Sequence, residues 1–121
     1  MRKTVIIGAT TNPSRYAFMA AKRLTNHQEE FVPVGIKKGE VFGKEILDIR
    51  THPEIPNVDT VTLYLNDRNQ HDWEEYILSL RPKRIIFNPG AENPSLAEKA
   101  QSQGVEVENA CTLVMLGNGL Y

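Results

Sequence analysis

The segment from Gly8 to Arg15 combines glycine, hydroxyl and amide residues in an order that suits anion binding. It follows an apolar run, Thr4–Ile7, and precedes a helical pattern, so we expect free backbone N–H groups beside its side chains. The segment keeps the first glycine of the dinucleotide-binding fingerprint and lacks the second and third. We therefore predict a phosphate or carboxylate site, with ordinary helix capping by Asn12 or Ser14 as the structural alternative. The candidate residues of this first loop are Gly8, Ala9, Thr10, Thr11, Asn12, Pro13, Ser14 and Arg15.

Two adjacent lysines follow the next strand pattern, Phe31–Ile36. An NAD site usually places an acidic residue here to bind ribose hydroxyls, whereas Lys37 and Lys38 favour an additional phosphate. That phosphate could be the 2′-phosphate of NADP or the 3′-phosphate of coenzyme A. A solvated surface pair is the alternative, but the position after a strand that adjoins the first loop favours binding.

Two further loops follow strand patterns. Leu65 and Asn66 end the pattern Thr60–Leu65, where an adenine could lie against the leucine and bond to the backbone or the asparagine. The other loop is formed by Asn88, Pro89 and Gly90, and its glycine lets a ligand approach the backbone closely.

A basic group precedes the fourth strand pattern, at the edge of the sheet opposite these loops. We expect its members to be surface charge; they are Arg81, Lys83 and Arg84.

Cys111 lies near the start of a predicted terminal helix within Ala110–Leu116. A helix N-terminus lowers the pKa of a thiol, so this cysteine is a candidate reactive thiol, with a small buried core residue as the alternative. The three histidines are not spaced to bind a metal with one another or with Cys111, and we expect no metal site. We also find no serine nucleophile elbow, no Walker A loop and no carboxylate pair with a plausible shared site, so we expect no complete catalytic set.

The elements that must position these residues alternate between strand and helix along the chain. Apolar residues repeat at helical spacing from Ala17 to Leu24 and from Trp73 to Leu80, with Asn69 as the expected cap of the second helix. Asn93 is expected to cap a third helix. This alternation predicts a three-layer, doubly wound α/β fold with a mostly parallel sheet of about five strands. The candidate loops would then share the carboxyl edge of the sheet. The expected strands cover residues 4–7, 31–36, 60–65, 84–88 and 105–107, with 46–49 as a short edge strand.

Length and composition narrow the class of protein. The 121 residues fit a single domain over residues 1–121. One cysteine cannot form an internal disulfide, and a cytoplasmic protein is the expectation. The net charge of −1 gives no general basic field for nucleic acid, and no segment is long and apolar enough to cross a membrane.

The chain resembles small stand-alone CoA-binding proteins of the Rossmann type, which are similar to the first domain of the succinyl-CoA synthetase α subunit. The resemblance covers almost the whole chain and rests on VIIGATTNPSRY, VPVGIKKGEVFGKEI, TLYLN, IIFNPGAENP and ENACTLVML. It implies a Rossmann-like fold and coenzyme A as the ligand. It also implies that Thr10–Arg15 line the diphosphate and the pantetheine entrance, and that Lys37 or Lys38 is the family's basic position. Leu65 and Asn66 match the adenine-side loop, and Asn88, Pro89 and Gly90 match the loop under the phosphates or pantetheine. Cys111 matches a cysteine near the last helix of family members.

The chain departs from the synthetase in ways that limit the expected activity. The synthetase needs a further domain with a phosphorylated histidine and a partner subunit, and its first loop is richer in glycine. We therefore expect non-catalytic binding of coenzyme A or an acyl-CoA, a small nucleotide ligand, rather than ligation. The residues leave four alternatives open: an NADP-dependent oxidoreductase, a subunit of an acyl-CoA ligase, a thiol carrier or redox sensor that uses Cys111, and an interaction subunit. In the last case the apolar segment Leu113–Leu116 would pack on an unknown protein partner or, in a homodimer, on a second copy.

Overall fold

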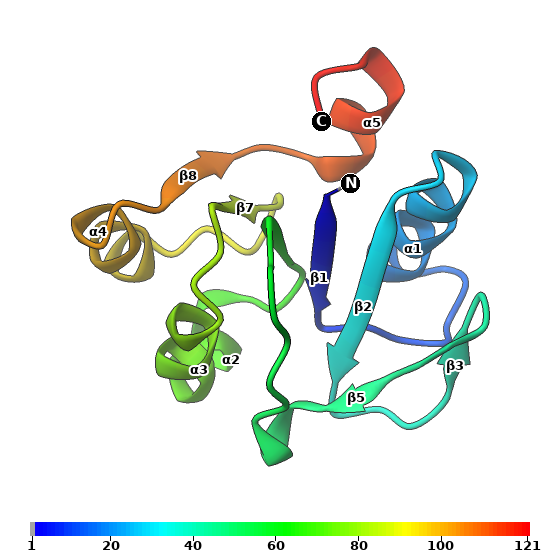
Figure 1. Ribbon diagram of the computed structural model, residues 1–121, viewed down its shortest axis with the longest axis horizontal. Coiled ribbons are helices and arrows are strands. Elements are labelled where there is room, and N and C mark those ends of the chain that lie inside the picture. The colour runs from blue at the N-terminus through cyan, green and yellow to red at the C-terminus, as the bar shows by residue number, and fades with distance from the viewer. Residues whose placement is uncertain (1) are drawn as a thin grey trace.

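A six-stranded parallel sheet forms the centre of the computed structural model, which describes residues 2–121 (Figure 1). Its strand order is β5-β2-β1-β6-β7-β8, and the order reverses direction between β1 and β6. The predicted doubly wound α/β fold is confirmed. The sheet has six strands rather than about five because the expected edge strand pairs with β2 through Val34 and Gly35. The strands are β1 (Lys3–Ile7), β2 (Glu30–Gly35), β5 (Leu47–Asp48), β6 (Thr60–Leu63), β7 (Arg84–Phe87) and β8 (Glu106–Asn109).

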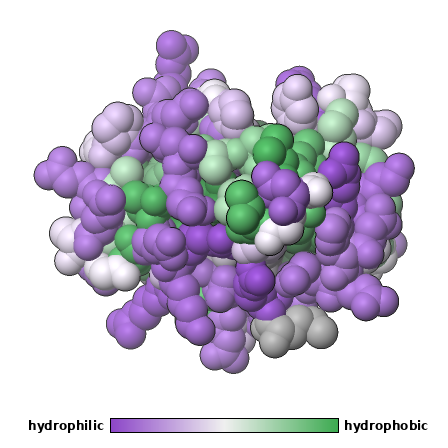
Figure 2. Space-filling view, turned by 90° about the horizontal axis from the view of Figure 1, so that it is seen from above, coloured by the Kyte–Doolittle hydropathy of each residue, from purple (hydrophilic) through white to green (hydrophobic). Residues whose placement is uncertain are grey.

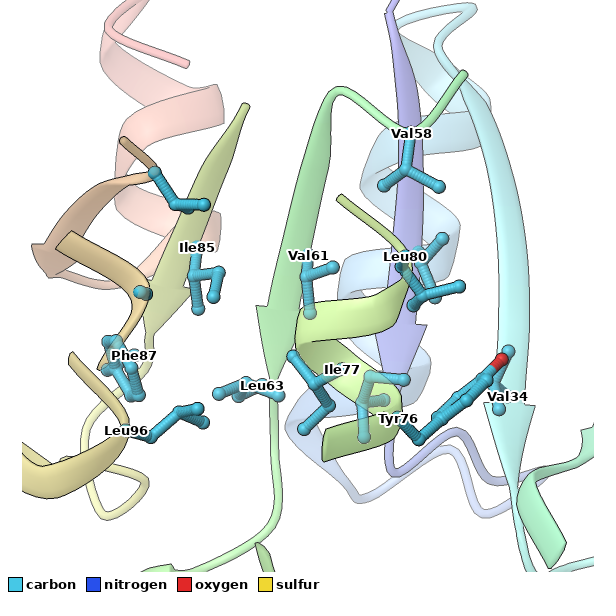
Figure 3. Packing of buried hydrophobic residues seen from close by; sticks show 14 of the residues in the cluster. Val34, Val58, Val61, Leu63, Tyr76, Ile77, Leu80, Ile85, Phe87 and Leu96 are labelled. Atoms are coloured by element: carbon cyan, nitrogen blue, oxygen red, sulfur yellow. The ribbon is translucent and has the colours of Figure 1, made fainter. Parts of the chain in front are cut away.

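Helices cover both faces of this sheet, and the alternation of side chains along each strand divides the core in two. In β1, Val5 and Ile7 belong to the cluster that holds α3 and α4 residues, whereas Ile6 belongs to the cluster that holds α1 and α5 residues. Figure 3 shows the first cluster, in which Ile77 and Leu96 face the apolar side chains of β6 and β7. The helices are α1 (Tyr16–Asn26), α2 (Asp67–Gln70), α3 (Glu74–Ser79), α4 (Pro94–Ser102) and α5 (Thr112–Asn118), with short 3-10 turns η1 (Ile49–Thr51) and η2 (His71–Trp73).

The helix starts agree with the sequence prediction at α4, differ from it at α2, and rule out the capping alternative at α1. Asn93 caps α4 as predicted, because its Oδ1 accepts from the backbone N–H of Leu96 at 3.2 Å. The cap of α2 is Asn66, not Asn69, because Asn66 Oδ1 accepts from the backbone N–H of Asn69 at 2.8 Å. The helix therefore begins earlier than predicted. At α1 the N-cap residue is Arg15 and makes no side-chain capping bond, so capping by Asn12 or Ser14 is wrong.

A small hairpin lies outside the main sheet, in a segment where no strand is predicted from the sequence. Strands β3 (Glu40–Val41) and β4 (Lys44–Glu45) pair antiparallel around a two-residue turn, Phe42–Gly43. The Phe42 ring packs on Phe18 of α1, with ring centroids 5.1 Å apart. The hairpin is thereby fixed beside the first loop and its helix.

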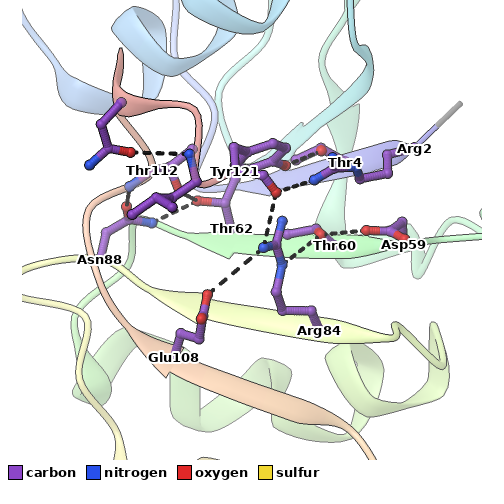
Figure 4. A network of polar contacts seen from close by, with 12 residues as sticks. Arg2, Thr4, Asp59, Thr60, Thr62, Arg84, Asn88, Glu108, Thr112 and Tyr121 are labelled. Carbon is purple, nitrogen blue, oxygen red and sulfur yellow. Dashed lines mark hydrogen bonds and ion pairs between the residues drawn. The ribbon is translucent and has the colours of Figure 1, made fainter. Parts of the chain in front are cut away.

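The amino-terminal edge of the sheet is closed by a network of polar contacts (Figure 4). Arg84 was expected to be surface charge, and this is wrong. Its Nε donates to Thr60 Oγ1 at 3.1 Å, and its Nη1 donates to the Tyr121 carbonyl oxygen at 3.3 Å and lies 3.8 Å from a Glu108 carboxylate oxygen. The guanidinium also lies over the Tyr121 ring, 4.7 Å from its centroid. Arg84 is half-buried because residues from three distant segments enclose it.

The outer surface above this edge is mainly hydrophilic, with apolar side chains visible between the polar ones (Figure 2). Within residues 2–121, none of the helices has the length and apolarity that a membrane span requires.

Candidate functional site

A cleft of about 710 Å³ opens at the carboxyl edge of the sheet. Segments that follow β1, β2, β6 and β7 line it together, as the topology rule for open α/β sheets predicts. Nine of the predicted site residues lie in this lining. They are Gly8, Ala9, Thr10, Arg15, Lys37, Leu65, Asn66, Pro89 and Gly90.

Three cationic side chains line the cleft from three different segments. Arg15 precedes α1, Lys37 follows β2 and Arg68 lies in α2. None of them forms an ion pair with another of residues 2–121, and Asp72 is the one acidic residue among those that line the cleft. Unpaired cations around a concave site raise the local potential and attract anions. The cleft therefore suits a ligand with several negative charges.

Two glycines let the loops under the cleft approach one another. The N–H groups of Gly8 and Ala9 donate to the Val34 carbonyl oxygen at 2.9 and 3.0 Å, which ties the first loop to β2. Gly8 has a positive φ of 99°, and a Cβ there would lie 3.3 Å from Leu65 Cδ2. A Cβ at Gly35 would lie 2.9 Å from the Ala9 carbonyl oxygen. The floor of the cleft thus depends on backbones that pack without side chains between them.

The tip of the first loop lies outside the cleft lining. Its polar groups bond to one another: Thr10 Oγ1 accepts from the N–H of Asn12 at 3.1 Å, and Asn12 Oδ1 accepts from the N–H of Ser14 at 3.0 Å and its hydroxyl at 2.8 Å. These bonds shape a turn that is exposed to solvent. The structure does not bring four predicted site residues into the lining; they are Thr11, Asn12, Pro13 and Ser14.

Asn88 is a predicted site residue that the structure places beneath the cleft rather than in its lining. It is 3% exposed. Its Nδ2 donates to Thr62 Oγ1 at 2.7 Å and to the Leu63 carbonyl oxygen at 2.9 Å, and its Oδ1 accepts from the N–H of Thr112 at 2.9 Å (Figure 4). The amide joins β6, β7 and the start of α5, so its hydrogen-bonding groups are used within the protein.

Lys38 and Cys111 also lie outside the cleft lining. Lys38 lines an adjoining groove that contains Glu40, Glu45 and Asp48. The Asp48 carboxylate accepts a hydrogen bond from the Arg50 guanidinium, which holds the pKa of Asp48 below its usual value. Cys111 is the half-buried N-cap residue of α5, which agrees with its predicted place at a helix start.

Tyr64 lines the cleft, although the sequence analysis did not select it. Burial raises the pKa of its phenol to about 12, so the hydroxyl stays protonated at neutral pH. The phenol oxygen is buried and has no hydrogen-bond partner among residues 2–121.

Several other residues of the cleft are not among the predicted site residues, because the helix after β6 begins earlier than predicted. With Asn69 as the expected cap, Arg68 was treated as part of a loop, whereas it lies in α2 and faces the cleft. Trp73 was assigned to a buried helical face, but it is half-buried and lines the cleft. The signal in the sequence for the earlier helix start is Asn66, because asparagine is a favoured N-cap residue. The polar and aromatic cleft residues of this region are Arg68, Asn69, Asp72 and Trp73. Tyr16 and Tyr64 also line the cleft, but they lie outside this helix and their absence from the predicted site has no connection with its start.

The acidic, histidine and cysteine side chains do not gather into a metal site within residues 2–121, where no group of three or more of them could hold an ion. Apolar and aromatic residues instead share the cleft with the cations. Tyr16 and Ile36 line it and are largely exposed, at 67% and 57%. This mixture of flat apolar surface and positive charge suits a ligand with both a ring system and phosphates.

The parallel sheet with helices on both faces is a Rossmann-like architecture. The model of the family described as "CoA binding domain" matches residues 2–117, so the chain belongs to that family. The resemblance found in the sequence is confirmed.

Solved structures agree with this assignment of the fold. A crystal structure described as an uncharacterized protein is 55% identical, with a TM-score of 0.96, and the match covers 100% of this chain and 98% of that one. A hypothetical protein from Pyrococcus horikoshii OT3 is 22% identical, with a TM-score of 0.82 and coverage of 98% and 83%. A conserved hypothetical protein from Pyrococcus furiosus is 23% identical, with a TM-score of 0.80 and coverage of 94% and 98%. No curated protein matches the chain.

Proposed function

We propose that this protein binds coenzyme A or an acyl-CoA in the cleft and acts as a binding module rather than as an enzyme. The observation that carries the proposal is the set of three unpaired cations, Arg15, Lys37 and Arg68, around one cleft in a member of the CoA-binding domain family. Coenzyme A carries a diphosphate and a separate 3′-phosphate, so its negative charge is spread over two places. Cations from three segments match such a ligand better than they match a single phosphate.

In this proposal, different residues of the cleft bind different parts of coenzyme A. The first loop, with Gly8, Thr10 and Arg15, holds the diphosphate, and Lys37 binds the 3′-phosphate. Adenine lies against Leu65, with the backbone and Asn66 as polar partners. Asn66 Oδ1 already caps α2, so its Nδ2 is the group available to a ligand. Pro89 and Gly90 border the pantetheine.

The same cleft also supports a second candidate, the binding of NADP. Lys37 follows β2, where a cation can bind the 2′-phosphate of that cofactor. The first loop lacks two glycines of the dinucleotide fingerprint, which supports coenzyme A over NADP.

Isothermal titration calorimetry with four ligands tests the proposal. We expect coenzyme A to bind more tightly than dephospho-CoA, and adenosine 3′,5′-bisphosphate to retain part of the affinity. We expect NADPH to bind more weakly than coenzyme A. Absence of binding by coenzyme A would overturn the proposal, and tighter binding of NADPH would replace it with the second candidate.

A further inference from the structure

One buried glutamine connects two walls of the cleft. Gln70 is the last residue of α2, and its side chain is fully buried at 0% exposure. Its Nε2 donates to the Leu65 carbonyl oxygen at 2.7 Å and to the Ala91 carbonyl oxygen at 2.7 Å. Leu65 follows β6 and Ala91 follows β7, and both line the cleft. A single side-chain amide therefore links the two loops.

The neighbours of Gln70 fix the orientation of this amide. Its Oε1 accepts from Asn93 Nδ2 at 3.0 Å, and the same nitrogen donates to Glu74 Oε2 at 3.0 Å. The reverse orientation would place the Gln70 oxygen against two carbonyl oxygens, which offer no donor. Because Asn93 also caps α4, the amide is held by an element that does not itself line the cleft.

The two carbonyl groups need this side chain because they lie beyond the ends of their strands. Strand β6 ends at Leu63 and β7 ends at Phe87, so the sheet ladder does not extend to Leu65 and Ala91. A buried carbonyl that loses its partner moves toward another donor or toward water. Movement of Leu65 would also reach the first loop, because the Leu65 side chain lies against the Gly8 backbone.

We infer that Gln70 is a positioning residue for the ligand cleft, and that it controls ligand affinity through the spacing of the Leu65 and Ala91 loops. The inference rests on the proposed function, since the affinity in question is that for coenzyme A. Gln70 is buried and does not line the cleft, so it does not touch the ligand. Its substitution acts on binding by moving residues that do.

The test compares Gln70→Met with a control that is destabilised elsewhere. Methionine keeps the length and volume of the side chain but removes both donors. We expect coenzyme A affinity to fall about tenfold, the equivalent of about one hydrogen bond. In the ligand-free Gln70→Met variant we expect faster amide hydrogen exchange at residues 64–66, 90 and 91 than in the ligand-free wild type. Val105→Ala is the control, because Val105 is buried in the core next to β8, at the opposite edge of the sheet. It lowers the free energy of unfolding and should leave affinity and exchange at both loops unchanged.

A second variant, Gln70→Asn, keeps the amide and shortens its reach by one methylene, so that it cannot reach both carbonyls in place. We expect the same direction of change, measured by the same two methods. Wild-type affinity in a folded Gln70 variant overturns the inference, and so does an equal loss in Val105→Ala. If the wild-type protein does not bind coenzyme A, the proposed function fails, and unchanged exchange at the two loops in the ligand-free variants separately refutes the positioning role.

Discussion

Both edges of the central sheet carry cationic side chains, but the surroundings of these side chains differ. At the amino edge, Arg84 meets Thr60, Glu108 and Tyr121 and is partly enclosed by them. At the carboxyl edge, Arg15, Lys37 and Arg68 surround an open cleft and form no ion pair within residues 2–121. A cation that has a protein partner stabilises the fold, whereas a cation held at a cleft without one is available to a ligand. We therefore expect substitutions at the amino edge to change stability and substitutions at the carboxyl edge to change binding.

The largest effect is expected at the closed edge. Arg84→Met removes two hydrogen bonds, an ion pair and a ring contact around a half-buried guanidinium. We expect the free energy of unfolding in urea to fall by about 3 kcal/mol, while coenzyme A affinity stays at the wild-type value. Lys83→Met, at the exposed neighbouring residue, is the control and should change neither quantity. A folded Arg84→Met variant with weakened binding would contradict the separation of the two edges.

The opposite result is expected for a cation of the open edge. Lys37→Gln should weaken coenzyme A binding about tenfold, or about 1.4 kcal/mol, and leave the free energy of unfolding unchanged. Dephospho-CoA should bind both proteins equally, because it lacks the 3′-phosphate assigned to Lys37. Lys38→Gln is the matched control, since its side chain lines the adjoining groove instead of the cleft. Calorimetry at two salt concentrations measures both variants, and an equal loss in Lys38→Gln would refute the assignment.

Two glycines with similar positive φ values, one at each edge of the sheet, allow the edges to be compared. Gly8 and Gly104 have positive φ values of 99° and 83°, so alanine is strained at both positions. We expect Gly8→Ala and Gly104→Ala each to lower the free energy of unfolding by about 1 kcal/mol. Gly8→Ala should also weaken coenzyme A binding, because its Cβ would press on Tyr64 and Leu65 in the cleft, whereas no atom lies within 4 Å of a Cβ at Gly104. Equally weak binding of coenzyme A by both variants would show that backbone strain lowers affinity wherever it lies in the sheet, and would contradict a specific role of Gly8 in the cleft.

The smallest expected effect is a pH dependence of the free energy of unfolding. It arises from Glu74, which bonds to Asn93 and Lys99. Burial raises the pKa of Glu74, but the hydrogen bond from Asn93 and the ion pair with Lys99 outweigh it and lower the pKa below its usual value. A carboxyl group with a lowered pKa contributes stability above its unfolded-state pKa and loses it as the pH falls through the folded-state value. The stability advantage of the wild type over Glu74→Gln should therefore shrink as the pH falls below about 4.5. Urea unfolding from pH 6 to pH 3 measures it, with the exposed Glu75→Gln as control; a constant difference would contradict the sign.

The sequence predicted the open edge better than the closed edge for a physical reason. The cleft is built from segments that directly follow strands, so local patterns locate Gly8, Lys37 and Gly90 at one edge once a parallel sheet is inferred. The environment of Arg84 depends on Tyr121, which lies far away in the sequence and has no local signal there. A contact of this kind follows from tertiary packing and not from periodicity.

Two local errors have local causes. The β3–β4 hairpin was missed because its turn places Phe42 at a positive φ of 49°, where a glycine or asparagine would be the usual signal. The start of α2 was misplaced because Asn66 and Asn69 are both good capping residues, and only the observed bond decides between them. Because of this second error, Arg68 and Trp73 are not among the predicted site residues.

The order of the strands also has a consequence for how the chain folds. The first three elements, β1, α1 and β2, form a continuous unit whose pairing needs only the first 35 residues. The other side of β1 pairs with β6, where Thr4 aligns with Thr60, so the central strand stays half-unpaired until residues 60–63, about the middle of the chain, have been made. Every ladder of the main sheet is parallel and crosses a long connection, and such pairings form slowly. During synthesis, the unpaired edge of β1 is therefore a site at which the incomplete chain can aggregate with other chains.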